Sequence, residues 1–321
     1  MSAADWATVL LSPWLLGLLG LLIGSFLNVV VHRLPAMVMR DWWRWDLADF
    51  ALADPRSWRA AFGARAEPPQ ELAAASAAVV ARLDAEAPLT LTRPRSRCPH
   101  CGHVILAREN VPVLSWLALR GRCSACKARI SARYPLVELV TAGLFAACAV
   151  TFGVKAMTVV ACTAVALLLV MGLVDLDTTL LPDSLTIPLV VLGLVAAGAG
   201  WSGVSWRDAA TGALLGYGVL WALGAFWQVV FRKANAMAEG DMKMLAGIGA
   251  LLGWQVLPGV LFLAAGLGAV VGVALIAFGG HRRDKPIPFG PYLALGGLVA
   301  IFFAAPLRDL GITLAQSFGL V

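Results

Sequence analysis

Charged residues are scarce in this sequence, because only 14% of its 321 residues are Asp, Glu, Lys or Arg while 60% are hydrophobic. Ordinary soluble domains carry about 25% charged residues, so this shortage excludes that class. The sequence also lacks an internal repeat and a Gly-rich phosphate-binding loop, so spacing assigns no residues to a nucleotide-like ligand. The composition predicts a membrane protein with no nucleic-acid partner, despite a net charge of +6.

Basic residues are absent before the first apolar run, residues 6–31, which holds 26 residues without a charged side chain. A membrane span needs about 20 residues, and no small-residue cleavage site is evident, so we expect a retained helix rather than a signal peptide. The uncharged run 244–280 is too long for one span, and Leu257-Pro258-Gly259 is a turn signal that divides it in two. The other predicted helices are 135–154, 156–174, 184–204, 209–231 and 288–306. The sequence therefore predicts an all-α polytopic membrane protein with about eight transmembrane helices.

Basic residues are also rare in every second loop. If the N-terminus lies outside, the external loops hold only Lys155, Arg207 and Arg308, which leaves 22 of the 25 basic residues inside. Lys and Arg are enriched in cytoplasmic loops. We therefore expect a periplasmic N-terminus and a cytoplasmic location for the polar interval between the first two helices.

One acidic corner lies in "AMAEGDMKMLAG", residues 236–247, at the entrance to the long uncharged run. Asp241 fits two interpretations at this place. It could cap the helix that starts near Met242, because Asp is a preferred N-cap residue. It could also be functional, because a carboxylate at the edge of the hydrocarbon is costly unless something holds it.

A second acidic corner, "VDLDTTLLPDSLT", residues 174–186, is predicted at the same membrane face. Asp183 follows Pro and precedes an apolar run, which favours an N-cap role. Asp177 is expected in a solvated loop. Asp175 follows an apolar helix, where a negative charge opposes the helix dipole, and therefore needs another explanation.

Two carboxyl groups held close together in a poorly solvated site cannot both ionise easily, so they share one proton. One can then remove a proton from a water molecule that attacks a peptide carbonyl, while the other protonates the developing oxyanion. A pair of this kind hydrolyses peptide bonds without a nucleophilic side chain.

Four cysteines form two CxxC pairs with 21 residues between them: Cys98, Cys101, Cys123 and Cys126. Paired CxxC motifs at about this spacing are typical of a tetrahedral four-thiolate zinc site, and a redox role for each pair is the alternative. A cytoplasmic location disfavours disulfides. His100 and His103 are expected at the surface, and Cys148 and Cys162 are expected to pack inside apolar helices.

The order of several motifs resembles that of type IV prepilin peptidases, which are bacterial intramembrane aspartyl proteases with a GxGD signature. The motifs are "GSFLNVVVHRLP" (24–35), the paired CxxC segment (98–126), "YPLVELV" (134–140), "DLDTTLLPDSLTIPL" (175–189), "EGDMKMLAGIGALLGW" (239–254) and "PFGPYLALGG" (288–297). The resemblance implies that Asp175, seven residues before Pro182, and Asp241, the Asp of GxGD, are catalytic. We expect the neighbouring Gly240, Lys243, Asp177 and Asp183 to support the site.

The sequence departs from the GxGD signature at Ala238, which replaces the first Gly. Ala would strain the turn if this position needs a positive φ angle, and would add only one methyl group if it needs close helix packing. We expect the milder case.

The resemblance also implies a function and a location. Such enzymes of the bacterial inner membrane cleave the leader from type IV prepilins or pseudopilins, and transfer a methyl group from S-adenosylmethionine to the new N-terminal amine. The expected cofactors are a structural Zn²⁺ and S-adenosylmethionine as methyl donor, but no residues can be assigned to the donor. The partners are the pilin substrates and the lipid bilayer.

The predicted domain order is a first helix (1–35), an insert (36–93), a zinc-ribbon-like segment (94–133) and a seven-helix peptidase domain (134–321). Within the insert, "MRDWWRWDL" (39–47) has the Trp and charge mixture of an interfacial anchor. "PQELAAASAAVVARLDAE" (69–86) predicts an Ala-rich helix. The favoured interpretation of this stretch is a variable insert. On the first helix, Asn28 and His32 lie one turn apart, and helix packing is their expected role.

Two other functions are compatible with parts of the sequence. A proton- or cation-coupled transporter would explain Asp175 and Asp241, but not the cysteines, and no inverted repeat is visible. A noncatalytic membrane scaffold with a zinc-binding domain would explain the cysteines, but would leave both acidic corners without a role.

Overall fold

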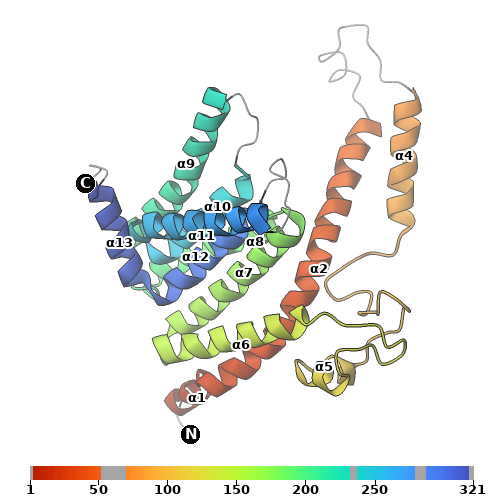
Figure 1. Cartoon of the computed structure of the whole chain (residues 1–321), viewed down its shortest axis with the longest axis horizontal. Coiled ribbons are helices and arrows are strands. Elements are labelled where there is room, and N and C mark those ends of the chain that lie inside the picture. Colours follow the sequence, from red (N-terminus) through yellow and green to blue (C-terminus); the bar gives the residue numbers. More distant parts are fainter. Residues whose placement is uncertain (1–2, 52–69, 232–236, 279–286, 318–321) are drawn as a thin grey trace. The chain divides into compact units, whose positions relative to one another are not determined.

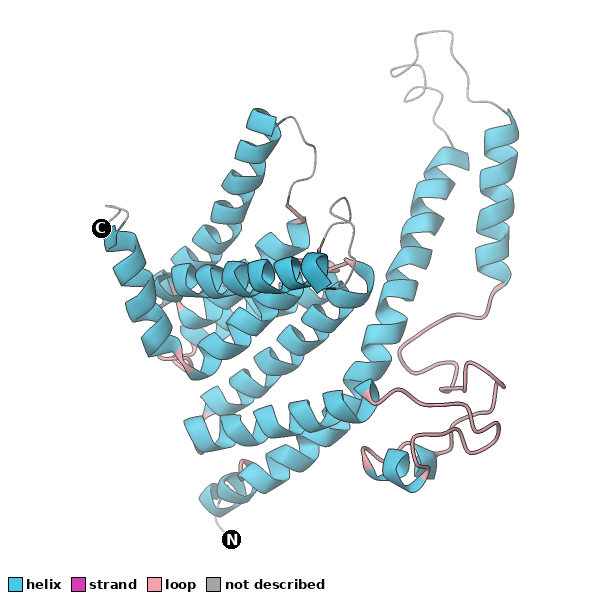
Figure 2. Cartoon of the chain, in the orientation of Figure 1, coloured by secondary structure: helices cyan, strands magenta, loops and turns pink. Residues whose placement is uncertain are grey.

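The protein is almost entirely helical in the computed structural model, which describes residues 3–51, 70–231, 237–278 and 287–317. Within these ranges there is no β-strand (Figure 2). Isolated bridges join Arg97 to Val104 and Arg122 to Arg129. The all-α prediction is confirmed. The basic stretches 232–236 and 281–285, which carry part of the predicted charge asymmetry, lie outside the described residues.

The described helices follow one another along the chain as labelled in Figure 1: α1 (Ala3–Leu10), α2 (Pro13–Ala51), α4 (Gln70–Ala85), α5 (Leu114–Ala118), α6 (Arg133–Phe152), α7 (Ala156–Thr178), α8 (Asp183–Gly198), α9 (Trp206–Phe231), α10 (Glu239–Leu252), α11 (Leu257–Phe278), α12 (Gly290–Phe302) and α13 (Ala304–Ser317). Two short 3₁₀ turns, η1 (Ala107–Glu109) and η2 (Trp254–Val256), precede α5 and α11.

Each of the eight predicted segments is mainly helical, but the break between α1 and α2 divides 6–31, and the break between α12 and α13 divides 288–306. The long uncharged run is divided at η2, directly before the Leu257-Pro258-Gly259 turn signal, which forms the first turn of α11. Among the described residues, five helices are long and apolar enough to cross a membrane, namely α2, α6, α7, α9 and α11 extended by η2. The pair α12 and α13 could form a sixth span, although it bends by 113°. Two of the predicted spans, α8 and α10, have only 16 and 14 residues.

The chain divides into two compact units, one formed by Met1–Asn28 with Ala107–Val321 and the other by Val29–Leu106. The second unit contains the C-terminal part of α2 and the predicted Ala-rich helix, which is α4. Ion pairs join α2 to the end of α4: Arg40 Nη2 lies 2.6 Å from Glu86 Oε2, and Arg44 Nη2 lies 3.0 Å from Asp84 Oδ1. The Trp-rich stretch 39–47, predicted as an interfacial anchor, lies within α2, which continues to Ala51.

In the first unit, α10 is the most enclosed helix, because nearly every residue from Asp241 to Leu252 is buried. It packs mainly against α8 and α9, while α7 packs against α12. The backbones of α9 and α10 meet at Gly212 and Gly249, where a Cβ atom on either residue would overlap the other backbone. Small residues at such crossings let membrane helices approach closely.

Helices α2 and α6 also make a close contact within this unit. Asn28 is buried, and its Nδ2 donates to the backbone carbonyl of Tyr134 at 3.2 Å. The expectation that Asn28 serves helix packing is confirmed.

Candidate active site

Four helix ends meet at one end of the first unit. Helix α7 ends there, and α8, α10 and α12 begin there (Figure 1). The two acidic corners of the sequence are brought together at this place, because Asp175 lies in the last turn of α7 and Asp241 in the first turn of α10. The two carboxyl groups are near enough for the charge of Asp175 to act on Asp241.

Asp175 is buried, with 5% of its surface exposed. Its backbone carbonyl accepts the N–H of Thr179 at 2.8 Å, and the positive φ angle of Thr179 (54°) ends α7 directly afterwards. Its side-chain carboxyl group accepts a hydrogen bond from the backbone N–H of Gly290, at the start of α12. This donor replaces part of the hydration that burial removes.

Asp241 is equally buried, with 5% exposure. It does not cap its helix, because the N-cap position is Ala238 and no side chain makes a capping hydrogen bond there. The capping interpretation is therefore wrong. Its Oδ1 atom is buried and has no hydrogen-bond partner among the described residues. An unpaired buried carboxyl oxygen is costly and marks a candidate functional group.

Gly240 and Ala238 occupy the turn that leads into α10. A Cβ atom on Gly240 would overlap the Leu181 side chain and would lie 3.0 Å from the Leu181 carbonyl oxygen, so the missing side chain permits close packing. Ala238 is exposed and has φ −76° and ψ 135°, which any L-residue adopts. The expectation that Ala in place of the first GxGD glycine causes no backbone strain is confirmed.

Lys243 joins the first turns of α8 and α10. Its Nζ lies 2.6 Å from Asp183 Oδ1 and 2.9 Å from Glu239 Oε1. Asp183 is the first residue of α8, after the N-cap Pro182, and no side-chain capping bond forms. The predicted N-cap role of Asp183 is therefore wrong, and its carboxylate is used in an ion pair between helices.

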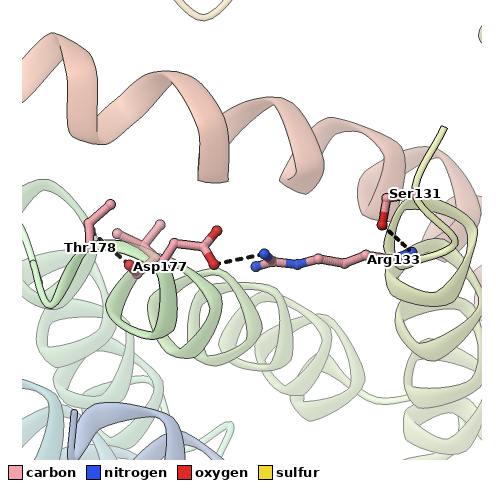
Figure 3. Close-up of polar contacts among 5 residues, drawn as sticks. Ser131, Arg133, Asp177 and Thr178 are labelled. Carbon is pink, nitrogen blue, oxygen red and sulfur yellow. Dashed lines mark hydrogen bonds and ion pairs between the residues drawn. The ribbon is translucent and has the colours of Figure 1, made fainter. Parts of the chain in front are cut away.

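Asp177 also makes an ion pair between helices, although a solvated loop was expected. Figure 3 shows Asp177, from the end of α7, pointing toward Arg133, the first residue of α6. The distance from Arg133 Nη1 to Asp177 Oδ1 is 2.7 Å. The backbone N–H of Arg133 donates to Ser131 Oγ at 3.2 Å, which orders the entry to α6 (Figure 3).

The two CxxC pairs form turns with the same hydrogen-bond pattern. In the first, Cys98 N–H donates to the His103 carbonyl at 2.9 Å and Gly102 N–H donates to the Cys98 carbonyl at 2.9 Å. In the second, Cys123 N–H donates to the Ala128 carbonyl at 2.8 Å and Lys127 N–H donates to the Cys123 carbonyl at 3.1 Å. Both turns include a positive φ angle, 72° and 61° respectively at the residue after the second Cys of each pair.

The four thiols can hold one metal ion, because the Sγ atoms of all four lie within 4.8 Å of one another: Cys98, Cys101, Cys123 and Cys126. Tetrahedral zinc with Zn–S bonds of about 2.3 Å needs sulfur atoms about 3.8 Å apart, so a small inward movement completes such a site. None of these four cysteines is joined in a disulfide, and neither is the buried Cys148 or the buried Cys162. The expectation that the last two are interior packing residues is confirmed.

Gly290 and Arg133 both contact the acidic corners, and the sequence predicted no role for either residue. The signal available for Gly290 was its place in "PFGP", where a Gly directly precedes the Pro of a helix start. Arg133 carried no local signal, because its partner is 44 residues away in the chain.

Comparison with known proteins gives two family matches that together cover most of the chain. Residues 18–152 match the bacterial peptidase A24 N-terminal domain, and residues 162–273 match the type IV leader peptidase family. The "Prepilin leader peptidase/N-methyltransferase" of Aeromonas hydrophila is 45% identical over 295 residues, which cover 91% of this chain and 92% of the relative. The protein of the same name from Stutzerimonas stutzeri is 44% identical, and the match covers 89% of this chain and 88% of the relative. The one from Burkholderia pseudomallei (strain 1026b) is 43% identical, and the match covers 90% of this chain and 84% of the relative. No solved structure matches the chain significantly.

Proposed function

Because this chain belongs to the family of prepilin leader peptidase/N-methyltransferases, we propose that Asp175 and Asp241 are the paired carboxyl groups with which it hydrolyses its substrates. The chain is a membrane-embedded peptidase that cleaves the leader from prepilins and N-methylates the new N-terminus. The observation that supports the residue assignment is the convergence of two buried carboxyl groups, from helices far apart in the sequence, at one junction of helix ends.

The proposed chemistry needs one proton shared by the two carboxyl groups. The ionised member removes a proton from a water molecule as its oxygen attacks the scissile carbonyl carbon. The protonated member gives its proton to the carbonyl oxygen, which yields a neutral tetrahedral intermediate. When the C–N bond breaks, the first carboxyl group passes its new proton to the leaving amine, and the second recovers a proton from the intermediate.

The surroundings of the pair suit this mechanism. Both side chains are almost inaccessible to water, which strengthens their electrostatic interaction and disfavours double ionisation. The unpaired Oδ1 of Asp241 remains available for a hydrogen bond to substrate. Gly240 supports the site by allowing Leu181 to lie against the turn, and Lys243 supports it by joining α8 to α10.

We further propose that the site faces the cytoplasm of a bacterium, at the inner membrane, with the N-terminus in the periplasm. The basic-residue distribution supports this orientation. A prepilin or pseudopilin has a basic leader followed by an apolar helix, so the leader would remain on the cytoplasmic side. The carboxylates of Asp183 and Glu239 share one counter-charge, Lys243, so the net negative charge that remains there would attract the leader electrostatically.

The cysteine segment (94–133) is proposed as a structural zinc domain, distinct from the insert (36–93) and from the peptidase domain (134–321). A short segment has little core of its own, so a bound Zn²⁺ would contribute much of its folding free energy. The methyl donor is proposed to be S-adenosylmethionine. Since the hydrolytic groups are carboxyls from α7 and α10, zinc would not take part in peptide cleavage.

Asp175→Asn and Asp241→Asn test the assignment. An amide cannot exchange the shared proton, so each variant is expected to lose leader cleavage by at least about 100-fold, the usual contribution of a general acid or base. The purified proteins are incubated with a full-length prepilin and with a peptide that already has the mature N-terminus. Mass spectrometry then reads the N-terminus with and without S-adenosylmethionine.

Retained methylation of the mature peptide serves as the fold control for both variants. Near-wild-type cleavage by either variant would remove that residue from the catalytic pair.

A further inference from the structure

The start of α12 lies against the proposed catalytic pair at Gly290. A Cβ atom on this glycine would lie 2.5 Å from Asp175 Oδ2, 2.9 Å from Asp175 Cγ and 3.1 Å from Leu181 Cδ1. Non-bonded carbon and oxygen atoms do not approach to 2.5 Å, so no other residue type fits here while Asp175 keeps its position. The carboxyl group occupies the space that a side chain would fill.

The backbone N–H groups of the first turn of α12 show that Gly290 has a particular donor role. Pro291 has no N–H, and the N–H groups of Tyr292 and Leu293 donate to the Phe289 carbonyl at 3.1 and 3.2 Å. The Gly290 N–H donates to Asp175. The positive end of the α12 dipole is therefore directed at this carboxyl group through one hydrogen bond.

We infer that Gly290 is a positioning residue for peptide cleavage, which holds the Asp175 carboxylate through its N–H and admits it through its missing side chain. This inference rests on the proposed function of Asp175 and Asp241. Donation from an N–H stabilises the carboxylate form, so Gly290 selects Asp175 as the ionised member that activates water. Asp241, whose Oδ1 has no partner among the described residues, is then the member that holds the shared proton.

A substitution at Gly290 is informative because the backbone conformation at this position is one that other residue types also adopt. Its φ angle is outside the positive region, and Ala is the better helix former. The main consequence of Gly290→Ala is therefore displacement of the Asp175 carboxyl group, with a smaller contact at Leu181. Gly266→Ala on α11 is a matched control, because a Cβ atom there would meet nothing within 4 Å.

A second variant separates the hydrogen bond from the steric effect. Replacing Gly290 with glycolic acid by nonsense suppression changes its amide N–H to an ester oxygen and adds no atom. This variant keeps the shape of the site and removes only the donor. The ester variant therefore creates no steric overlap that could impair folding, whereas Gly290→Ala does.

The experiment measures kcat and KM for prepilin cleavage, and methylation of the mature peptide, in wild type, both Gly290 variants and Gly266→Ala. We expect kcat to fall about 100-fold in Gly290→Ala, as for an ångström-scale misplacement of a reacting group. A smaller fall of about tenfold is expected in the ester variant, with KM and methylation near wild type in both. Gly266→Ala should match the wild type throughout.

Wild-type kcat in Gly290→Ala would overturn the inference. An ester variant with wild-type kcat would also overturn it, because packing alone would then explain the need for glycine. An ester variant that loses cleavage and methylation equally would overturn it as well, because the loss would then come from a general folding defect and not from the position of Asp175. Failure of the proposed function is a separate result, since it appears as retained cleavage in Asp175→Asn, whatever the Gly290 variants do.

Discussion

The ion pair between Arg133 and Asp177 should have a moderate effect on activity, in contrast to Asp175 two residues earlier on α7. Asp177→Asn and Arg133→Gln each remove one charge of the pair, and the double variant removes both. The Nη1 to Oδ1 distance is 2.7 Å, and the side chains are 35% and 28% exposed. The pair is therefore partly screened by solvent.

The expected coupling energy follows from this exposure. Fully exposed ion pairs contribute about 0.2 to 1 kcal/mol, and removing one partner of a buried pair costs about 3 to 5 kcal/mol. For a pair about one-third exposed we expect a coupling of about 1 kcal/mol, which is about fivefold in an equilibrium or rate constant. Asp177→Asn should cost more than Arg133→Gln, because it leaves the guanidinium, whose Nη2 is already buried without a partner, without its counter-charge.

The assay is a double-mutant cycle on kcat/KM for leader cleavage and on the midpoint of thermal inactivation. Each single variant should retain cleavage within about tenfold of wild type, and the double variant should lose about 1 kcal/mol less than the sum of the single losses. Strict additivity would show that the two side chains do not interact in the active protein. Loss of cleavage in Asp177→Asn as complete as in Asp175→Asn would place Asp177 in the catalytic pair.

Three further outcomes are expected. Cys98→Ser should lower the zinc content from about one per chain and impair methylation more than cleavage, and a chelator should not stop cleavage directly; metal-free wild type or a reversible Cys98–Cys101 disulfide would favour a redox role. Ala238→Gly should leave cleavage within about twofold of wild type, since its φ angle of −76° suits Ala, and a large gain would reveal strain. Single cysteines beside Lys155 should react with an impermeant thiol reagent added to the periplasmic side, and those beside Lys233 should not; the opposite pattern would reverse the proposed orientation.

Local sequence patterns were sufficient to predict most of the helices. Charge-free runs marked where the long ones lie, and the Pro-Gly turn signal at 257–259 divided the longest run directly after η2, at the start of α11. These features depend on neighbouring residues and on the length of a span, which the sequence shows directly. Span length failed for α8 and α10. Helix α10 is enclosed by the protein and need not match the hydrocarbon thickness, whereas α8 has only 16 residues although Ile187, Val191 and Val195 on one side of it are exposed.

The polar contacts at the site could not be predicted in the same way. Asp183 and Asp177 were assigned local roles from their neighbours, as an N-cap and a loop residue. Their partners, Lys243 and Arg133, are 60 and 44 residues away in sequence. A carboxylate at a helix start satisfies both a capping rule and an ion pair between helices, and only the packing of α8 against α10 decides between them.

The arrangement of helix ends explains how so many carboxyl groups can gather at the edge of the membrane domain. Three helices, α8, α10 and α12, begin at this junction, and each presents the positive end of its dipole to it. Asp183, Glu239 and Asp241 lie in the first turns of α8 and α10, where negative charge is favoured. Asp175 is the exception, because it lies in the last turn of its own helix, where the dipole opposes its charge. The start of α12 offsets this cost through the Gly290 N–H, so the carboxyl group that the sequence alone could not explain is stabilised by a helix that begins 115 residues later.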